Sequence, residues 1–330
     1  MPRLLFIGTL ALDVIAKLDK PGHAVVGKLT AADFMARAFA DKVELDRLEV
    51  RPGGSAANAA IAAHALGSTC GLVSAVGGDL FGKHLVANMK RHGIAVDGVA
   101  TLAGQKTSTS VILLSDGNKA VLSSRGAFAH LGPKNLREPL VRQADVVVTT
   151  SLSSDENYAL FLKAVKLAHA DRKKIVFAPS MTMLKAQGSK FARLHPHFDL
   201  AICNEAEALY YTGEKTAEAA VKKLPGRVRV VTMAKKGAIA FADGRLLRIA
   251  APPVEVVDTT GAGDAFTGAF VHELYSSGDV KKALVTATAV AGLKLSHLGA
   301  HFTGAARDVA AFERKHARAL AVKRIQLFGV

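Results

Sequence analysis

Cysteine is scarce in this chain of 330 residues, which contains only Cys70 and Cys203 and no CxxC pair. Small secreted domains held together by disulfides, and domains built around a structural zinc ion, need several cysteines at close spacing. Both classes are therefore excluded. The low cysteine content also fits the reducing environment of the cytoplasm, where we expect this protein to work.

Long uninterrupted apolar runs are also missing. The opening stretch "MPRLLFIGTLALDVIAKLD" resembles a signal peptide at first sight, but Asp13 interrupts it and no clear small-residue cleavage site follows. No other stretch has the length and apolarity of a transmembrane helix. Half of the residues are apolar and 22% are charged, so we expect a soluble protein with a large buried core and no membrane partner.

Tryptophan is absent and only 6% of the residues are aromatic, so side chains that could stack on bases are few. Acidic residues are outnumbered, and the formal net charge is +15. A positive field attracts phosphates and nucleic acids, but it does not select among anions. A solvated basic surface explains the charge more simply, and we therefore expect no nucleic-acid partner.

Short apolar segments alternate with helical segments through the middle of the chain. "ADVVVTT", "KKIVFAPS" and "FDLAICN" have the character of buried strands, and "DENYALFLKAVKLAHA" is typical of a helix between them. This alternation predicts a mainly parallel, doubly wound α/β sheet with helices on both faces. Two extended pieces, near 14–50 and 98–125, are expected to project as a small β lid. The whole chain, 1–330, is expected to form one domain with that lid.

The stretch "DTTGAGDAFTGAF", residues 258–270, puts two glycines where extended chain hands over to a helix. The free amides and the dipole at a helix N-terminus favour an anion, and glycine lets a ligand approach the main chain. Asp264 would repel a phosphate, but it is suited to accept a proton from a hydroxyl. The alternative is a structural turn in which Asp264 caps the helix.

Other glycine-rich phosphate sites are excluded. The chain has no GxxxxGK[ST] motif of the P-loop NTPases. "GAGDAF" has Phe266 where a dinucleotide fingerprint needs its third small residue, which argues against a nicotinamide site. The serines of "TSLSSDEN", 150–157, are interpreted as strand-end and helix-capping residues.

Two segments resemble the signatures of the ribokinase family of carbohydrate kinases, also called the PfkB family. "DTTGAGDAFTGAF" is similar to the C-terminal signature, and "RPGGSAANAAIAAHALG", residues 51–67, is similar to the N-terminal one. Their order and separation also fit, and the similarity extends over nearly the whole chain. The resemblance implies a ribokinase-like fold, ATP and Mg²⁺ as cofactors, and a small sugar or nucleoside as phosphoryl acceptor. Lid strands of this family often pair between subunits, which makes a homodimer an expectation.

The resemblance also implies roles for individual residues. The anion hole would consist of Gly261, Ala262 and Gly263, with Asp264 as the catalytic base. Residues that would bind the acceptor are Asp13, Gly53, Gly54 and Asn58.

On the donor side, the residues implied to contact the nucleotide or its phosphates are Asn204, Thr232 and Gly237. Glu207 follows Asn204 in an NxxE motif, so both side chains would share one helix face, with Glu207 holding Mg²⁺ through water. Many members also bind a monovalent cation such as K⁺, and the corresponding positions are Asp258, Thr260, Gly299 and Thr303.

Three positions depart from the common family pattern. Ser55 stands where sugar kinases often have lysine, Ala234 where many members have glycine, and Phe128 where asparagine is frequent. Phe128 could pack against a nucleobase, although core packing is the simpler interpretation of a single phenylalanine.

We therefore predict an ATP-dependent kinase that phosphorylates a hydroxyl of a small sugar. A nucleoside kinase of the same family is the alternative. A non-enzymatic protein that responds to sugar or nucleotide is the other class, and Asp264 weighs against it because a pure binder does not need that carboxylate.

Overall fold

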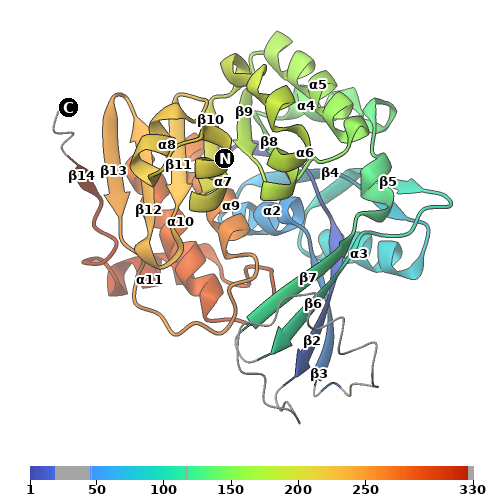
Figure 1. Cartoon of the computed structure of the whole chain (residues 1–330), viewed down its shortest axis with the longest axis horizontal. Coiled ribbons are helices and arrows are strands. Elements are labelled where there is room, and N and C mark those ends of the chain that lie inside the picture. Colours follow the sequence, from blue (N-terminus) through green and yellow to red (C-terminus); the bar gives the residue numbers. More distant parts are fainter. Residues whose placement is uncertain (19–44, 46, 116–117, 326–330) are drawn as a thin grey trace.

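The computed structural model of the chain describes residues 1–18, 45, 47–115 and 118–325 (Figure 1). Within this part of the chain the strands of a large sheet are β1 (Arg3–Ile7), β4 (Thr69–Gly77), β5 (Ala95–Leu102), β8 (Val146–Thr150), β9 (Lys174–Ala178), β10 (Leu200–Asn204), β11 (Val228–Thr232), β12 (Ala238–Ala242), β13 (Arg245–Ile249) and β14 (Lys323–Ile325). The strands of a small sheet are β2 (Ala11–Leu18), β3 (Arg47–Gly53), β6 (Thr109–Ser115) and β7 (Asn118–Ser124).

The helices cover the large sheet. They are α2 (Ser55–Ala65), α3 (Leu80–Arg91), α4 (Glu138–Gln143), α5 (Asp155–Ala170), α6 (Met181–Ala192), α7 (Glu205–Thr212), α8 (Ala217–Lys223), α9 (Ala262–Ser277), α10 (Val280–Leu295) and α11 (Ala306–Lys315). Short 3-10 turns span Gly126–His130, Pro133–Asn135, His195–His197 and Ala234–Lys236. None of the helices in the described ranges is long and apolar enough to cross a membrane.

The large sheet is mainly parallel. Its order is β14-β13-β12-β11-β10-β9-β8-β1-β4-β5, and every neighbouring pair from β11 to β5 is parallel. The last three strands, β12 to β14, add to the β11 edge in antiparallel fashion. The predicted α/β class and mainly parallel sheet are therefore confirmed.

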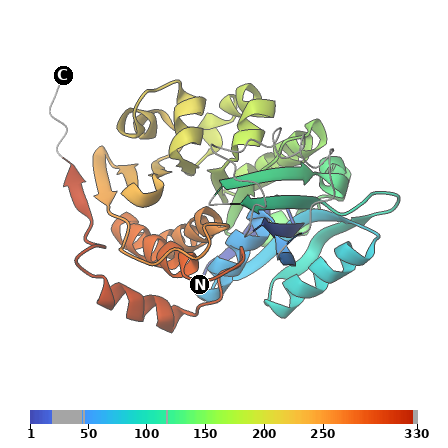
Figure 2. The same cartoon turned by 60° about the horizontal axis from the view of Figure 1, so that its bottom comes forward.

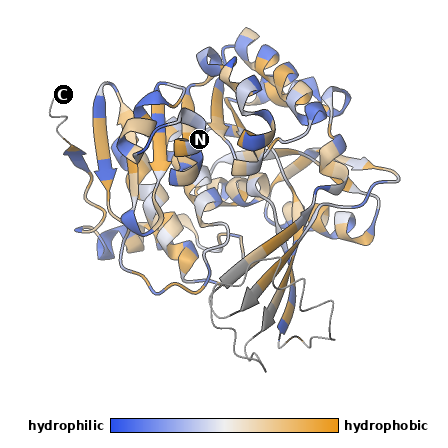
Figure 3. Cartoon of the chain, in the orientation of Figure 1, coloured by the Kyte–Doolittle hydropathy of each residue, from blue (hydrophilic) through white to orange (hydrophobic). Residues whose placement is uncertain are grey.

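Helices cover both faces of the large sheet. Because successive side chains of a strand point to opposite faces, each central strand contributes to two cores. On β1, Leu4 and Phe6 belong to the core beneath α2, α9 and α10, whereas Leu5 and Ile7 belong to the core beneath α4 to α8. Figure 2 shows these two helical layers on opposite sides of the sheet, and Figure 3 shows the apolar character of the central strands. The continuous apolar runs in the sequence reflect this double burial.

The small sheet has the order β3-β2-β6-β7 and projects from one end of the molecule (Figure 1). It contains the two extended pieces expected to form a lid, brought side by side by the parallel pairing of β2 with β6. Residues 95–102 belong instead to the large sheet, where β5 pairs with β4, so the second piece enters the small sheet only at Thr109. Residues 19–44, 46 and 116–117 of the expected lid lie outside the described residues.

Helices α2 and α9 pack with almost no side-chain layer between them. A Cβ built on Gly268 of α9 would lie 2.0 Å from the carbonyl oxygen of Ala59 in α2. The alanines of α2 make this approach easy, since interhelical distance depends on the side chains at the contact. The packing brings the N-terminal turns of the two helices together.

Candidate active site

Helix α9 begins with an open turn. Its N-cap is Gly261, whose φ of 76° lies in the left-handed region, and no described side chain caps this end. A Cβ on Gly261 would lie 2.1 Å from the carbonyl oxygen of Ala300, so only glycine fits. A Cβ on the exposed Gly263 would meet no described atom within 4 Å. The Ala262 amide donates to the Thr259 carbonyl oxygen at 3.4 Å, and the amides of Gly263 and Asp264 in this uncapped first turn are the ones that suit an anion.

Asp264 lies in this first turn, where it lines a pocket. Burial raises its pKa, the hydrogen bond from Asn58 opposes that effect, and the carboxylates of Glu207 and Asp13 raise the pKa further, to about 7. Such a carboxylate can exchange a proton near neutral pH. The alternative that Asp264 caps α9 is wrong, because Gly261 occupies the N-cap position.

The predicted acceptor residues lie on α2 and on the strands β2 and β3 of the small sheet. Asn58 is buried one turn into α2, and its Nδ2 donates a hydrogen bond of 2.8 Å to Asp264 Oδ2. Asp13 is buried in β2, beside Gly53, where a Cβ would lie 2.3 Å from Asp13 Oδ2. Gly54, the N-cap of α2, has a φ of 105°, and a Cβ there would lie 2.4 Å from the Thr9 carbonyl oxygen. Both glycines thus make room for close neighbours.

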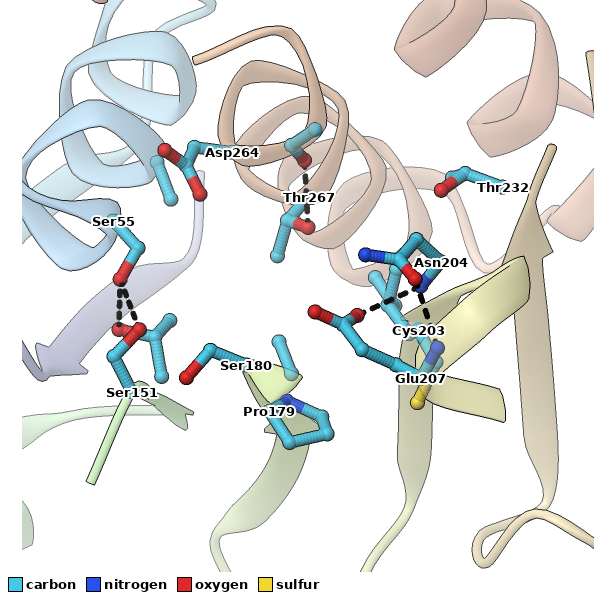
Figure 4. A pocket seen from close by; sticks show the side chains of 15 residues that line it. Ser55, Ser151, Pro179, Ser180, Cys203, Asn204, Glu207, Thr232, Asp264 and Thr267 are labelled. Atoms are coloured by element: carbon cyan, nitrogen blue, oxygen red, sulfur yellow. Dashed lines mark hydrogen bonds between the residues drawn. The ribbon is translucent and has the colours of Figure 1, made fainter. Parts of the chain in front are cut away.

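The pocket lies between α2, α9 and the carboxyl ends of β8, β9, β10 and β11 (Figure 4). This is the edge at which open α/β sheets bind ligands. The residues that line it are Ser55, Ala59, Thr150, Ser151, Ala178, Pro179, Ser180, Ile202, Cys203, Asn204, Glu207, Thr232, Gly263, Asp264 and Thr267. Five of the predicted site residues are among them: Asn204, Glu207, Thr232, Gly263 and Asp264.

Asn204 and Glu207 form a capping box at the start of α7. Asn204 Oδ1 accepts from the Glu207 amide and Glu207 Oε2 accepts from the Asn204 amide, each at 2.9 Å. Glu207 Oε1 accepts from the Met181 amide at 3.1 Å. Burial raises the pKa of Glu207, and these hydrogen bonds oppose the shift. The i, i+3 spacing of Asn204 and Glu207 therefore stabilises the start of α7, and both side chains also line the pocket.

Thr232 ends β11 at the pocket, whereas Gly237 serves the turn that follows. Gly237 has a φ of 88°, and a Cβ there would lie 2.0 Å from the Ile249 carbonyl oxygen. Ala234, where many family members have glycine, has a φ of 47°. Alanine is strained in this left-handed conformation, which explains the usual glycine.

The residues expected to hold a monovalent cation are only partly gathered. The Asp258 carboxylate accepts from the amides of Thr260, at 2.8 Å, and Gly299, at 2.9 Å. Burial raises its pKa, but these hydrogen bonds and the charge of Lys294 outweigh that and lower it. Thr303 is an exposed residue of the following loop. Lys294 itself carried no signal in the sequence, where it looks like an ordinary lysine near a helix end.

A cluster of hydroxyl groups on the pocket wall was missed by sequence reasoning. Ser55 Oγ lies 3.1 Å from Thr9 Oγ1, 3.1 Å from Thr150 Oγ1 and 2.7 Å from Ser151 Oγ. Ser151 is therefore more than a strand-end residue, although the capping role is correct for Ser154. Each of these residues follows or ends a strand or begins a helix, and that position was the available signal.

Phe128 belongs to the core and does not face the pocket. It is 1% exposed and packs with the residues beneath α4 to α8. The interpretation that Phe128 packs against a nucleobase is therefore wrong, and core packing is confirmed.

Comparisons with known proteins identify the family of this chain. Residues 20–305 match the model of the "pfkB family carbohydrate kinase". Ribokinase of Bacillus subtilis (strain 168) is 27% identical over 305 residues, which cover 91% of this chain and 95% of that protein.

Solved structures share the fold. Adenosine kinase from Sinorhizobium meliloti superposes with a TM-score of 0.79 at 22% identity, covering 95% of this chain and 99% of that one. A candidate ribokinase II from E. coli, solved with ATP and Mg²⁺, gives a TM-score of 0.80 at 22% identity, covering 96% and 100%. With the family model matched over most of its length, the chain belongs to the pfkB family of carbohydrate kinases.

Proposed function

We propose that this protein transfers the γ-phosphoryl group of ATP to a hydroxyl of a small sugar, with Asp264 as general base. The observation that carries the proposal is the combination of a carboxylate whose pKa is about 7 with the open first turn of α9. A base with a pKa near the working pH accepts a proton efficiently. The amides beside it would stabilise charge on the transferring phosphoryl group.

Asn58 links the base to the acceptor. Its Nδ2 holds Asp264, while its buried Oδ1 has no hydrogen-bond partner in the described part of the chain. An orphaned buried acceptor is costly, and a substrate hydroxyl that donates to it would remove the cost. Asp13, also buried and close enough to raise the pKa of Asp264, would accept from a second hydroxyl.

The donor side suits Mg²⁺ that keeps most of its waters. The described residues contain no group of three or more His, Cys, Asp or Glu side chains able to hold a metal directly. Glu207 offers a carboxylate to the pocket, and Ser180 and Thr232 offer hydroxyls. Such a sparse set of hard oxygens fits an ion held mainly by water and phosphate, where it would neutralise phosphate charge.

The acceptor is best matched by a polyol. The hydroxyl cluster around Ser55 offers donors and acceptors to several substrate hydroxyls. Phe128, the one residue that suggested a nucleobase, is enclosed in the core. These observations favour a sugar over a nucleoside.

The test is ATP consumption with Mg²⁺ against a panel of sugars, sugar phosphates and nucleosides. We expect turnover with a sugar, and Asp264→Asn should lower kcat by roughly 10²- to 10⁴-fold while ATP binding is retained. The matched control is Asp279→Asn, because Asp279 caps the neighbouring helix α10 with an oxygen that asparagine also has. Turnover only with nucleosides would favour the nucleoside kinase. ATP binding without turnover on any acceptor would favour the non-enzymatic alternative.

A further inference from the structure

Lys294, in the last turn of α10, is the most deeply buried cationic side chain in the part of the chain that the structure describes, at 1% exposure. Lysine is almost never fully buried unless its ammonium is paired. Here the Nζ donates to two main-chain carbonyl oxygens, those of Asp258 at 3.2 Å and His297 at 3.1 Å. Two loops that are distant in sequence therefore share one ammonium.

These two loops form the support of the open turn of α9. The amides of Val257 and Asp258 donate to the Leu295 carbonyl oxygen, at 2.8 and 3.2 Å. The Asp258 carboxylate joins the Thr260 amide on one loop to the Gly299 amide on the other. The Ala300 carbonyl in turn lies directly against Gly261, the N-cap of α9. Whatever fixes the two loops therefore fixes the first turn of α9.

The family resemblance puts a monovalent cation at this place, and the residues present do not fit one. Both carboxylate oxygens of Asp258 accept amide hydrogen bonds, and two carbonyl oxygens accept from Lys294. A second cation, Arg51, donates to the Leu298 carbonyl oxygen at 3.4 Å and lies against Gly299. An added K⁺ would meet the Lys294 ammonium and the Arg51 guanidinium, which pairs with Glu49, and four oxygens of the two loops already accept hydrogen bonds.

We propose that the ammonium of Lys294 takes the place of an inorganic monovalent cation beside the first turn of α9, so that the protein needs no K⁺. The ammonium carries the same single positive charge and binds the same kind of oxygen. It holds the carbonyls of Asp258 and His297 together, and its charge adds to the field that the α9 amides direct at an anion. Lys294 is thus a positioning residue, and its part in turnover rests on the proposed kinase function.

The unmodified protein provides the first test. Turnover and melting temperature would be compared in KCl, NaCl and choline chloride at equal ionic strength, because screening changes with salt concentration. We expect kcat to vary by less than about two-fold among the three salts, and the melting temperature to show no shift specific to K⁺. Activation by K⁺ of about ten-fold or more, or stabilisation by K⁺ alone, would overturn the proposal.

The second test is Lys294→Ala, which removes the ammonium and leaves room for an ion. In choline chloride we expect kcat to fall by roughly 10- to 100-fold, and K⁺ or NH₄⁺ to restore much of it. The variant should also gain a melting-temperature increase with K⁺ that the unmodified protein lacks. Lys282→Ala, at an exposed position of the same helix, is the matched control and should change neither property.

The readouts keep the two proposals apart. The K⁺-dependent melting shift needs no turnover, so its gain in Lys294→Ala would support the inference even if no acceptor were phosphorylated. A folded Lys294→Ala variant with no cation-specific recovery and no K⁺ shift would show a merely structural lysine and overturn the inference. If that variant does not fold, Lys294→Ser, which also removes the ammonium and leaves room for an ion, is measured in the same salts and judged by the same outcomes.

Discussion

Helices α7 and α9 both begin at the pocket, but side chains cap the first turn of α7 and not that of α9 (Figure 4). The turn of α7 closes on itself, since Asn204 and Glu207 accept each other's amide hydrogens. The turn of α9 begins at a left-handed glycine, and no side chain within the described ranges caps it. The start of α7 presents the Glu207 carboxylate to the pocket, and the start of α9 presents uncapped amides beside the Asp264 carboxylate.

The difference separates two electrostatic tasks within one pocket. A helix start with a capping box has two fewer amides left for an anion, and its carboxylate can attract a hydrated cation. A helix start without a cap has unsatisfied amides, and an anion that binds there satisfies them. A magnesium nucleotide carries both kinds of charge, and we therefore propose that α7 serves the metal and α9 the transferring phosphate.

Distorting the uncapped first turn of α9 should have the largest effect. In Gly261→Ala, the added Cβ meets the Ala300 carbonyl and the residue must hold a φ of 76°, so we expect kcat to fall by about 100-fold or more. The matched control is Gly213→Ala. Gly213 has a similar φ of 72° at the end of α7, but no described atom lies within 4 Å of its Cβ position.

Gly213→Ala should cost about 1 kcal/mol of unfolding free energy, and kcat should remain unchanged. Steady-state kinetics and urea unfolding of both variants provide the measurement. Similar losses of kcat in the two variants would contradict a special role for the α9 turn.

Removing the charge from the closed turn should have an intermediate effect. Glutamine keeps one acceptor oxygen, which is enough for the capping box, so Glu207→Gln should fold, at a cost of about 1 kcal/mol for the lost hydrogen bond from the Met181 amide. We expect the KM for magnesium ATP to rise by about ten-fold, with the KM for the acceptor unchanged. Glu205→Gln, at the partly exposed first residue of the same helix, is the control. An increase confined to the acceptor KM would argue against the assignment of α7 to the metal.

The smallest effect is a displacement of the pH profile. The base must be ionised to accept a proton, so kcat/KM should rise with pH and level off above a pKa of about 7. Asn58→Leu removes a hydrogen bond that favours the ionised carboxylate, so the rising limb should move to higher pH by about one unit.

Glu207→Gln should move the same limb to lower pH, because the Glu207 charge raises the pKa of Asp264. The opposite signs make each variant the control of the other. Profiles that move in the same direction, or not at all, would remove Asp264 as the titrating base.

The open turn of α9 was predictable because its signal is local. Glycines at 261 and 263, an aspartate at 264 and a helical pattern behind them lie within a few residues. The alternation of strands and helices likewise predicted the parallel sheet, since both buried faces demand apolar runs. The limit of the lid at 98 was less accurate, because strand pairing rather than composition assigns residues 95–102 to the large sheet.

Features made by long-range contacts were not predictable. Ser55 and Ser151 are 96 positions apart. They meet because the Ser55 amide donates to Thr9, which follows β1, and β1 pairs with β8, which Ser151 follows. Lys294 looks like a solvated residue at a helix end until the loops around 258 and 297 fold over it. Phe128 shows the converse, since a position that suggested ligand contact is filled by the core.

The backbone contact between Gly268 and Ala59 governs how the site can change over time. Because no side chains separate α2 from α9 there, rotamer changes cannot alter the spacing between Asn58 on one helix and Asp264 on the other. Asp264 and the acceptor-binding residue Asn58 are thus held by one close contact between two helices. New acceptor preferences would have to arise in the strand ends and the small sheet, where substitutions leave the hydrogen bond between Asn58 and Asp264 undisturbed.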